Sequence, residues 1–68
     1  MNSEDYPKSI DAFKNLLKSK DYRGEAHLNL GIIYFYSKQY KSAKYHWRKA
    51  TRYQSTNKQA KQYLQQIN

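Results

Sequence analysis

A self-similarity at an offset of 34 residues constrains this 68-residue chain more than any other feature of its sequence. After a shift of 34 positions, small residues fall on small ones, and large apolar residues mostly fall on large ones. The aligned pairs are Tyr6 with Tyr40, Ser9 with Ala43, Phe13 with Trp47, Leu16 with Ala50, Ala26 with Ala60, and Leu30 with Leu64. Self-similarity at a period of about 20–50 residues is typical of arrays of one recurring supersecondary unit. The fold is therefore expected to be built from repeated units.

The spacing of apolar residues predicts that these units are helical. Pro7 suits a first helical turn, and the apolar residues after it recur at helical spacing. Helices are predicted near 7–19, 24–37, 40–53 and 57–67, and Thr56 with Gln59 fits a capping box at the start of the last one. The absence of Val and the low Gly and Pro content argue against strands. Short connections imply antiparallel neighbours, so an all-α fold of about four helices in stacked hairpins is expected.

The central stretch carries a spaced motif. It reads His27-x-x-Leu30-Gly31-x-x-Tyr34, followed by Ala43-x-x-x-Trp47-x-x-Ala50. On these residues the chain resembles the tetratricopeptide repeat family, whose 34-residue unit is a helix–turn–helix. The resemblance implies a half repeat over 5–20, a full repeat over 24–57 and a capping helix over 57–67, stacked as a short right-handed superhelix. The sequence departs from the family pattern at His27 (Trp preferred), Lys44 (aliphatic), Ser55 (Pro) and Gln65 (Gly).

Gly31 lies inside a predicted helix and therefore needs a packing reason, because Gly there costs about 1 kcal/mol relative to Ala. Without a side chain at this position, the helix can approach the next one closely, at a point where Ala43 is also small. Trp47 and Tyr34 are expected to fill the space beside that contact.

The composition excludes several classes of site. There is no Cys, which removes disulfides and thiolate zinc sites, and no apolar run approaches the ~20 residues of a membrane span. The first residues lack the basic start and apolar stretch of a secretory signal, so the cytoplasm is the default compartment. His27 and His46 lie on different predicted helices with no carboxylate or Cys placed to complete a metal set. We expect a non-enzymatic protein with no metal and no cofactor.

The predicted helix 24–37 is apolar on two sides. One stripe, formed by Ala26, Leu30, Ile33 and Tyr34, is expected to face the core of the repeat. A helix of this kind must pack on both sides or expose a patch that binds a partner. Packing against the first and last helices would take some of the residues on the second side.

The resemblance implies a use for the second side, because in this family the first helix of each repeat lines a groove that holds a peptide. It places six residues on that groove: Glu25, Leu28, Asn29, Ile32, Phe35 and Tyr36. The family's carboxylate clamp uses Lys and Asn, and only Asn29 matches it here. An apolar peptide or a partner helix is therefore the expected ligand.

The charge distribution supports an alternative function. The net charge is +8, all five acidic residues lie in the first 25 positions, and eight basic residues follow them. The predicted helix 40–53 gathers cations and one aromatic residue on the face opposite Trp47: Lys41, Lys44, Tyr45, Arg48, Lys49 and Arg52. Cations around an aromatic ring can hold phosphates and stack a base, so the alternative is a small basic nucleic-acid-binding protein. An acidic protein partner is equally compatible, and a solvated face is the simpler interpretation.

The predicted first helix has more apolar surface than one neighbour covers. Ile10, Phe13 and Leu17 cannot all be covered by the helix that follows. Repeat modules generally need about three units for independent stability, because each unit buries its face on a neighbour. We expect this end to be closed by another copy of the chain or another protein, or the chain to be a piece of a longer array.

Overall fold

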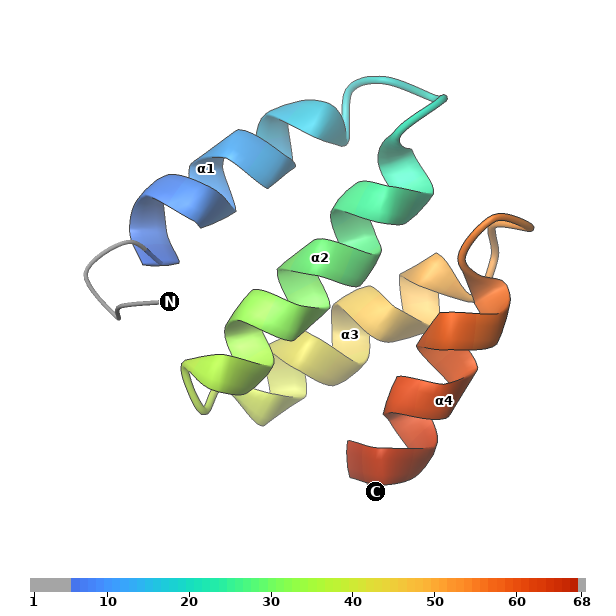
Figure 1. Cartoon of the computed structure of the whole chain (residues 1–68). Helices are drawn as coiled ribbons and strands as arrows, with labels where there is room; N and C mark the ends of the chain where they lie inside the picture. Colours follow the sequence, from blue (N-terminus) through green and yellow to red (C-terminus); the bar gives the residue numbers. More distant parts are fainter. Residues whose placement is uncertain (1–5, 68) are drawn as a thin grey trace.

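Four helices form the computed structural model of this protein, which describes residues 6–67 (Figure 1). They are α1 (Tyr6–Leu16), α2 (Arg23–Tyr36), α3 (Tyr40–Ala50) and α4 (Asn57–Ile67). The starts of α1 and α3 lie 34 residues apart, as do the starts of α2 and α4, so the period of the sequence is also the period of the helices. Two predictions fall partly or wholly outside the described part. They are the first residue of the expected half repeat 5–20 and the argument against a secretory signal, which rests on residues 1–5.

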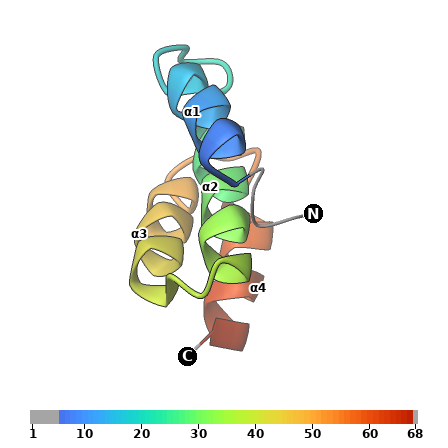
Figure 2. The ribbon, with the colours of Figure 1, turned by 90° about the vertical axis from the view of Figure 1, so that its left-hand side faces the viewer.

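Each helix packs against the helix that follows it in the chain. Contacts join α1 to α2, α2 to α3, and α3 to α4. α2 runs through the middle of the molecule, with α1 on one side and α3 and α4 on the other (Figures 1 and 2). The result is a flat body of 32 × 29 × 16 Å, and it confirms the predicted all-α fold of helix hairpins.

α2 is buried on two sides because it lies between α1 and α3. In the stripe predicted to face inward, Ala26, Leu30 and Ile33 are almost fully buried, and the fourth member, Tyr34, is half-buried. Leu28 is only 8% exposed and belongs to the hydrophobic cluster that also contains Ala43, Trp47, Ala50 and Ala60. The prediction that Leu28 lies on the groove surface is therefore wrong, because its side chain packs into this cluster with residues of α3 and α4.

Two helices end three residues earlier than their apolar patterns predicted. α1 ends at Leu16 and α3 at Ala50. The chain continues from both ends in tighter turns, in which amides bond to carbonyl oxygens three residues back, for example Ser19 to Leu16 at 3.1 Å and Tyr53 to Ala50 at 3.3 Å. Such i→i+3 bonds commonly close a helix C-terminus, and they keep the side chains near helical positions.

The turn between α2 and α3 is a Schellman motif. The amide of Gln39 donates to the carbonyl of Tyr34 at 2.8 Å, and the amide of Lys38 donates to Phe35 at 3.0 Å. Lys38 has a φ of 66°, which is the left-handed conformation that such a motif requires and that Gly adopts more readily. This turn reverses the chain and sets the α2–α3 hairpin.

The turn between α3 and α4 is held by a buried hydroxyl. Thr56 is 3% exposed, and its Oγ1 donates to the carbonyl oxygen of Ala50 at 2.8 Å. The predicted capping box of Thr56 with Gln59 is therefore wrong: the hydroxyl bonds back across the turn. Gly24 lies against the same turn, because a Cβ there would come within 2.8 Å of Tyr53 Cβ.

Candidate functional site

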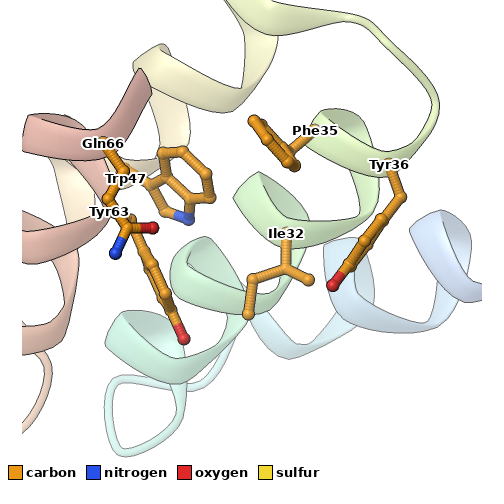
Figure 3. Close-up of a pocket in the computed structure, with 6 residues that line it drawn as sticks. All are labelled: Ile32, Phe35, Tyr36, Trp47, Tyr63 and Gln66. Atoms are coloured by element: carbon orange, nitrogen blue, oxygen red, sulfur yellow. The ribbon is translucent and has the colours of Figure 1, made fainter. Parts of the chain in front are cut away.

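A hollow of about 200 Å³ with an uncharged lining lies between α2 and α4, with α3 behind it (Figure 3). It is lined by Ile32, Phe35, Tyr36, Trp47, Tyr63 and Gln66. Figure 3 shows Phe35 and Tyr36 from α2 on one side, Trp47, Tyr63 and Gln66 on the other, and Ile32 between them. None of the six side chains carries a charge, so we name this surface the apolar hollow.

Aromatic rings form a continuous wall around the apolar hollow. The ring centroids of Phe35 and Trp47 lie 5.9 Å apart, and those of Trp47 and Tyr63 lie 5.0 Å apart. Phe35 also meets the rings of Tyr36 and Tyr40 edge to face, at 5.9 and 5.4 Å. Rings at these separations attract one another beyond the burial of their area, so each ring helps to fix the next.

Trp47 is the fixed point of this wall. Its indole is 3% exposed, and its Nε1–H donates to the carbonyl oxygen of Leu28 at 3.1 Å. The ring lies directly over Gly31, where an added Cβ would overlap Nε1 and Cδ1. Trp47, which was predicted to fill the space beside the contact of the two helices, is therefore the residue that needs Gly31 to lack a side chain.

The structure brings half of the predicted groove residues to the apolar hollow. Ile32, Phe35 and Tyr36 line it, with Phe35 38% and Tyr36 64% exposed. Leu28 is in the core, and neither Glu25, which is exposed, nor Asn29, which is half-buried, lines the hollow. The residues that sequence reasoning missed there are Trp47, Tyr63 and Gln66. The sequence had already placed Trp47 on the inward face of its helix, which was the available signal for that residue.

A second apolar hollow of about 330 Å³ lies where α1 meets α2. It is lined by Tyr6, Ile32, Ile33 and Tyr36. Because it shares Ile32 and Tyr36 with the apolar hollow, the two surfaces are continuous across α2. The apolar surface thus reaches from α1 to α4.

The outward side of α3 carries a hollow of a different chemistry. It measures about 250 Å³ and is lined by Lys41, Tyr45, Arg48, Lys49 and Arg52, which we name the basic face. The Lys49 ammonium lies 5.6 Å from the centroid of the Tyr45 ring, within cation–π range. The predicted basic stripe is therefore one continuous surface, except that Lys44 is half-buried and does not line the hollow.

A pair of histidines joins α2 to α3 inside the hairpin, which sequence reasoning did not predict. His27 and His46 are each 9% exposed, and their Nδ1 atoms lie 3.0 Å apart. One Nδ1–H must donate to the unprotonated Nδ1 of the other ring. The two Nδ1 atoms therefore hold one proton between them, because protons on both atoms would repel each other. The Tyr34 ring stacks on His46 at 5.4 Å, and Tyr53 stacks on His27 at 6.3 Å.

The surroundings of the pair favour neutral imidazoles. Burial, followed by the charge of His27 and of Lys14 on α1, lowers the pKa of His46 to about 4. Burial, followed by the charges of Lys49 and Arg23, also lowers the pKa of His27. A metal cation would meet the same three positive side chains, which argues against a metal at this pair.

The described residues contain no group of three or more His, Cys, Asp or Glu side chains that could hold a metal ion. Over residues 6–67, none of the helices combines the length and apolar character needed to cross a membrane. The chemistry that the two surfaces offer is non-covalent: the apolar hollow can take an apolar group, and the basic face can take an anion.

Comparison with known proteins gave one match. The family model described as Tetratricopeptide repeat matches residues 24–57, which contain α2 from its second residue, α3, the turns that follow these two helices and the first residue of α4. No curated protein and no solved structure matched the chain.

Proposed function

The chain belongs to the tetratricopeptide repeat family, and from this premise we propose that it is a non-catalytic protein-interaction module whose apolar hollow binds an apolar segment of a partner protein. The observation that carries the proposal is the ring of uncharged side chains contributed by α2, α3 and α4. Trp and Tyr are enriched among the residues that dominate binding energy at protein interfaces.

The size of the apolar hollow favours a side chain over a metabolite. Small-molecule sites usually measure about 300–1,000 Å³, and this hollow measures about 200 Å³. One large apolar side chain of a peptide or partner helix would fill it, while the rest of the segment lies across Ile32 and Tyr36 toward α1. The exposed rings of Phe35 and Tyr36 would then be covered on binding.

The test selects ligands from a displayed library of short random peptides on the folded chain and measures their affinities by fluorescence anisotropy. Enriched peptides are expected to carry apolar anchors at helical or extended spacing. Tyr36→Glu places a charge at the edge of the apolar hollow and should weaken binding about tenfold or more, which corresponds to about 1.4 kcal/mol. Tyr36 is 64% exposed, so this substitution leaves the fold in place.

Tyr45→Glu is the matched control for this test. Tyr45 is a comparably exposed tyrosine, 55% accessible, but it lies on the basic face and does not line the apolar hollow. Peptide affinity should stay close to that of the unmodified chain. Peptides that bind Tyr36→Glu as tightly as the unmodified chain would show that the apolar hollow is not the binding surface.

A second copy of the chain is a competing occupant for the apolar surface at α1. α1 has no buried residue, and Leu16 at its end is 38% exposed. Sedimentation equilibrium at micromolar concentration is expected to show a dimer that Leu16→Glu converts to monomer. A strictly monomeric chain with one sharp thermal transition would exclude self-association as part of the function.

A further inference from the structure

The basic face of α3 has a role that the apolar hollow does not explain, since the two surfaces share no residue. Four of its residues, Lys41, Tyr45, Arg48 and Lys49, follow one another at helical spacing on α3. Arg52 continues the stripe in the turn after the helix. Ala43, Trp47 and Ala50 are buried on the other side of the helix. We propose that this stripe is a binding site for single-stranded nucleic acid, with the cations on phosphates and the Tyr45 ring stacked on a base.

The charge around this site is of one sign. α3 and α4 contain no acidic residue, because every acid of the chain lies in the first 25 positions. Lys41, Arg48 and Arg52 are exposed, and Lys49 is half-buried with its ammonium over the Tyr45 ring. Four cations on and just after α3, without an acid on that helix, attract a polyanion from solution.

Tyr45 favours a nucleic acid over an acidic peptide. Its ring is 55% exposed and stands in the middle of the stripe. The ring centroid lies 5.0 Å from that of the nearly perpendicular His46 ring and 5.6 Å from the Lys49 ammonium. A glutamate side chain gains nothing from such a ring, whereas a base gains a stacking partner. Base–aromatic stacking is sequence-tolerant, so the site has no strong sequence preference.

The dimensions match a short stretch of one strand. From Lys41 to Arg52 the stripe spans about 16 Å at the helical rise. A strand carries one phosphate per ~3.4 Å in helical geometry, so the stripe covers a few nucleotides and contacts about four phosphates. Four contacts to a single strand predict that log K falls with log[salt] with a slope of about −3.

The experiment measures the affinity of the full chain for a fluorescein-labelled single-stranded oligonucleotide by anisotropy, over a series of NaCl concentrations. Lys41→Glu with Arg48→Glu on the basic face is compared with Lys58→Glu with Lys61→Glu on α4. Both pairs lower the net charge from +8 to +4 at exposed positions, so they are matched in charge and in environment. The α3 pair should weaken binding more than about tenfold, and the α4 pair about threefold or less.

The role of the ring is tested separately with Tyr45→Leu and with an abasic oligonucleotide of the same length. Tyr45→Leu should lower affinity about tenfold for the normal oligonucleotide, because stacking is lost. For the abasic strand, the variant and the unmodified chain should bind equally. Tyr36→Leu, on the apolar hollow, should leave both affinities unchanged.

Three results would overturn the proposal. Equal losses in the α3 and α4 charge variants would assign binding to net charge alone. A poly-glutamate peptide of equal charge that binds as tightly, with no effect of Tyr45→Leu, would make the site one for acidic proteins. Absence of measurable binding at low salt, in variants and unmodified chain alike and with normal circular dichroism, would leave the stripe a solvated face.

Discussion

At the scale of single residues, Trp47 and Gly31 act as one unit. The indole donates to the Leu28 carbonyl, lies over Gly31 and forms the back wall of the apolar hollow. Because one ring makes the hydrogen bond, the packing contact and the wall, a change in the packing of α2 on α3 also changes the shape of the apolar hollow. Protein interiors are close-packed, so even one added carbon at such a contact changes the stability of the fold.

Gly31→Ala should destabilise the chain by up to about 2 kcal/mol. Alanine gains about 1 kcal/mol of helix propensity, but its Cβ would lie 2.8 Å from Trp47 Cε2, and overpacking of this kind costs roughly 1–3 kcal/mol. Urea unfolding followed by circular dichroism measures the difference. In the double variant, Trp47→Phe should reduce the loss of unfolding free energy that Gly31→Ala causes. A Gly31→Ala chain that is more stable than the original would contradict the close contact.

The histidine pair makes stability depend on pH. His46 stays neutral in the folded chain down to about pH 4, whereas in the unfolded chain it binds a proton near its ordinary pKa of 6.5. Between these values the unfolded chain therefore binds more protons. The free energy of unfolding should fall as the pH is lowered from about 6.5 toward 4, by up to about 3 kcal/mol.

His46→Gln provides the comparison for this prediction. The variant loses the titrating ring but keeps the carboxylates, so its unfolding free energy should decline much less over the same interval. Urea unfolding at a series of pH values gives both curves. An NMR titration that places the pKa of His46 above 6 in the folded chain would contradict the prediction.

At the scale of elements, the α2–α3 turn determines how the hairpin closes. Its Schellman motif requires a left-handed residue, and the sequence supplies Lys38 with a φ of 66°. For an L-residue with a side chain this conformation costs about 1–2 kcal/mol per residue, and Gly is free of that cost. The packing of α2 on α3 therefore keeps the hairpin closed, although the left-handed conformation of Lys38 in its turn is unfavourable.

Lys38→Gly should stabilise the chain by about 0.5–1 kcal/mol, because relief of the left-handed strain exceeds the added entropy of the unfolded chain. Thermal unfolding by circular dichroism should show a higher midpoint. Lys44→Gly is the control, since Gly in the middle of α3 should destabilise by about 1 kcal/mol. A lower midpoint for Lys38→Gly would mean that the side chain of Lys38 contributes contacts that the backbone argument omits.

At the scale of the whole molecule, charge is divided unevenly between the two halves of the chain. The first 25 residues contain five acidic and five basic residues, and the remainder holds the entire net charge of +8. The molecule is only 32 Å long, so these charges repel one another over distances comparable to the ~10 Å Debye length at 0.1 M salt. Self-repulsion of this kind weakens a compact state.

Raising NaCl from about 10 mM to about 500 mM should therefore raise the midpoint of thermal unfolding by about 3–5 °C, or roughly 0.5–1 kcal/mol. The rise should be smaller in the variant with Lys41→Glu and Arg48→Glu, whose net charge is +4. Circular dichroism melts measure both chains. An equal rise in the two would attribute the effect to general salt action on apolar surface instead of charge screening.

Local spacing along the chain was enough to predict the helices, their 34-residue period and the family. It placed Trp47 inward on α3 and separated the basic face from the core, since helical periodicity fixes the angular position of each residue on its own helix. It also placed Phe35 and Tyr36 on the side of α2 that the apolar hollow occupies.

Which of these faces meet depends on how the helices pack, and the pattern along the chain does not predict that. The rotation of α2 against α3 buried Leu28 and put His27 against His46, and the approach of α4 added Tyr63 and Gln66 to the apolar hollow. Thr56 bonded across its turn instead of capping its own helix. Periodicity within one helix leaves its rotation and distance relative to a neighbour undefined, and those are set by the fit of side chains such as Trp47 over Gly31.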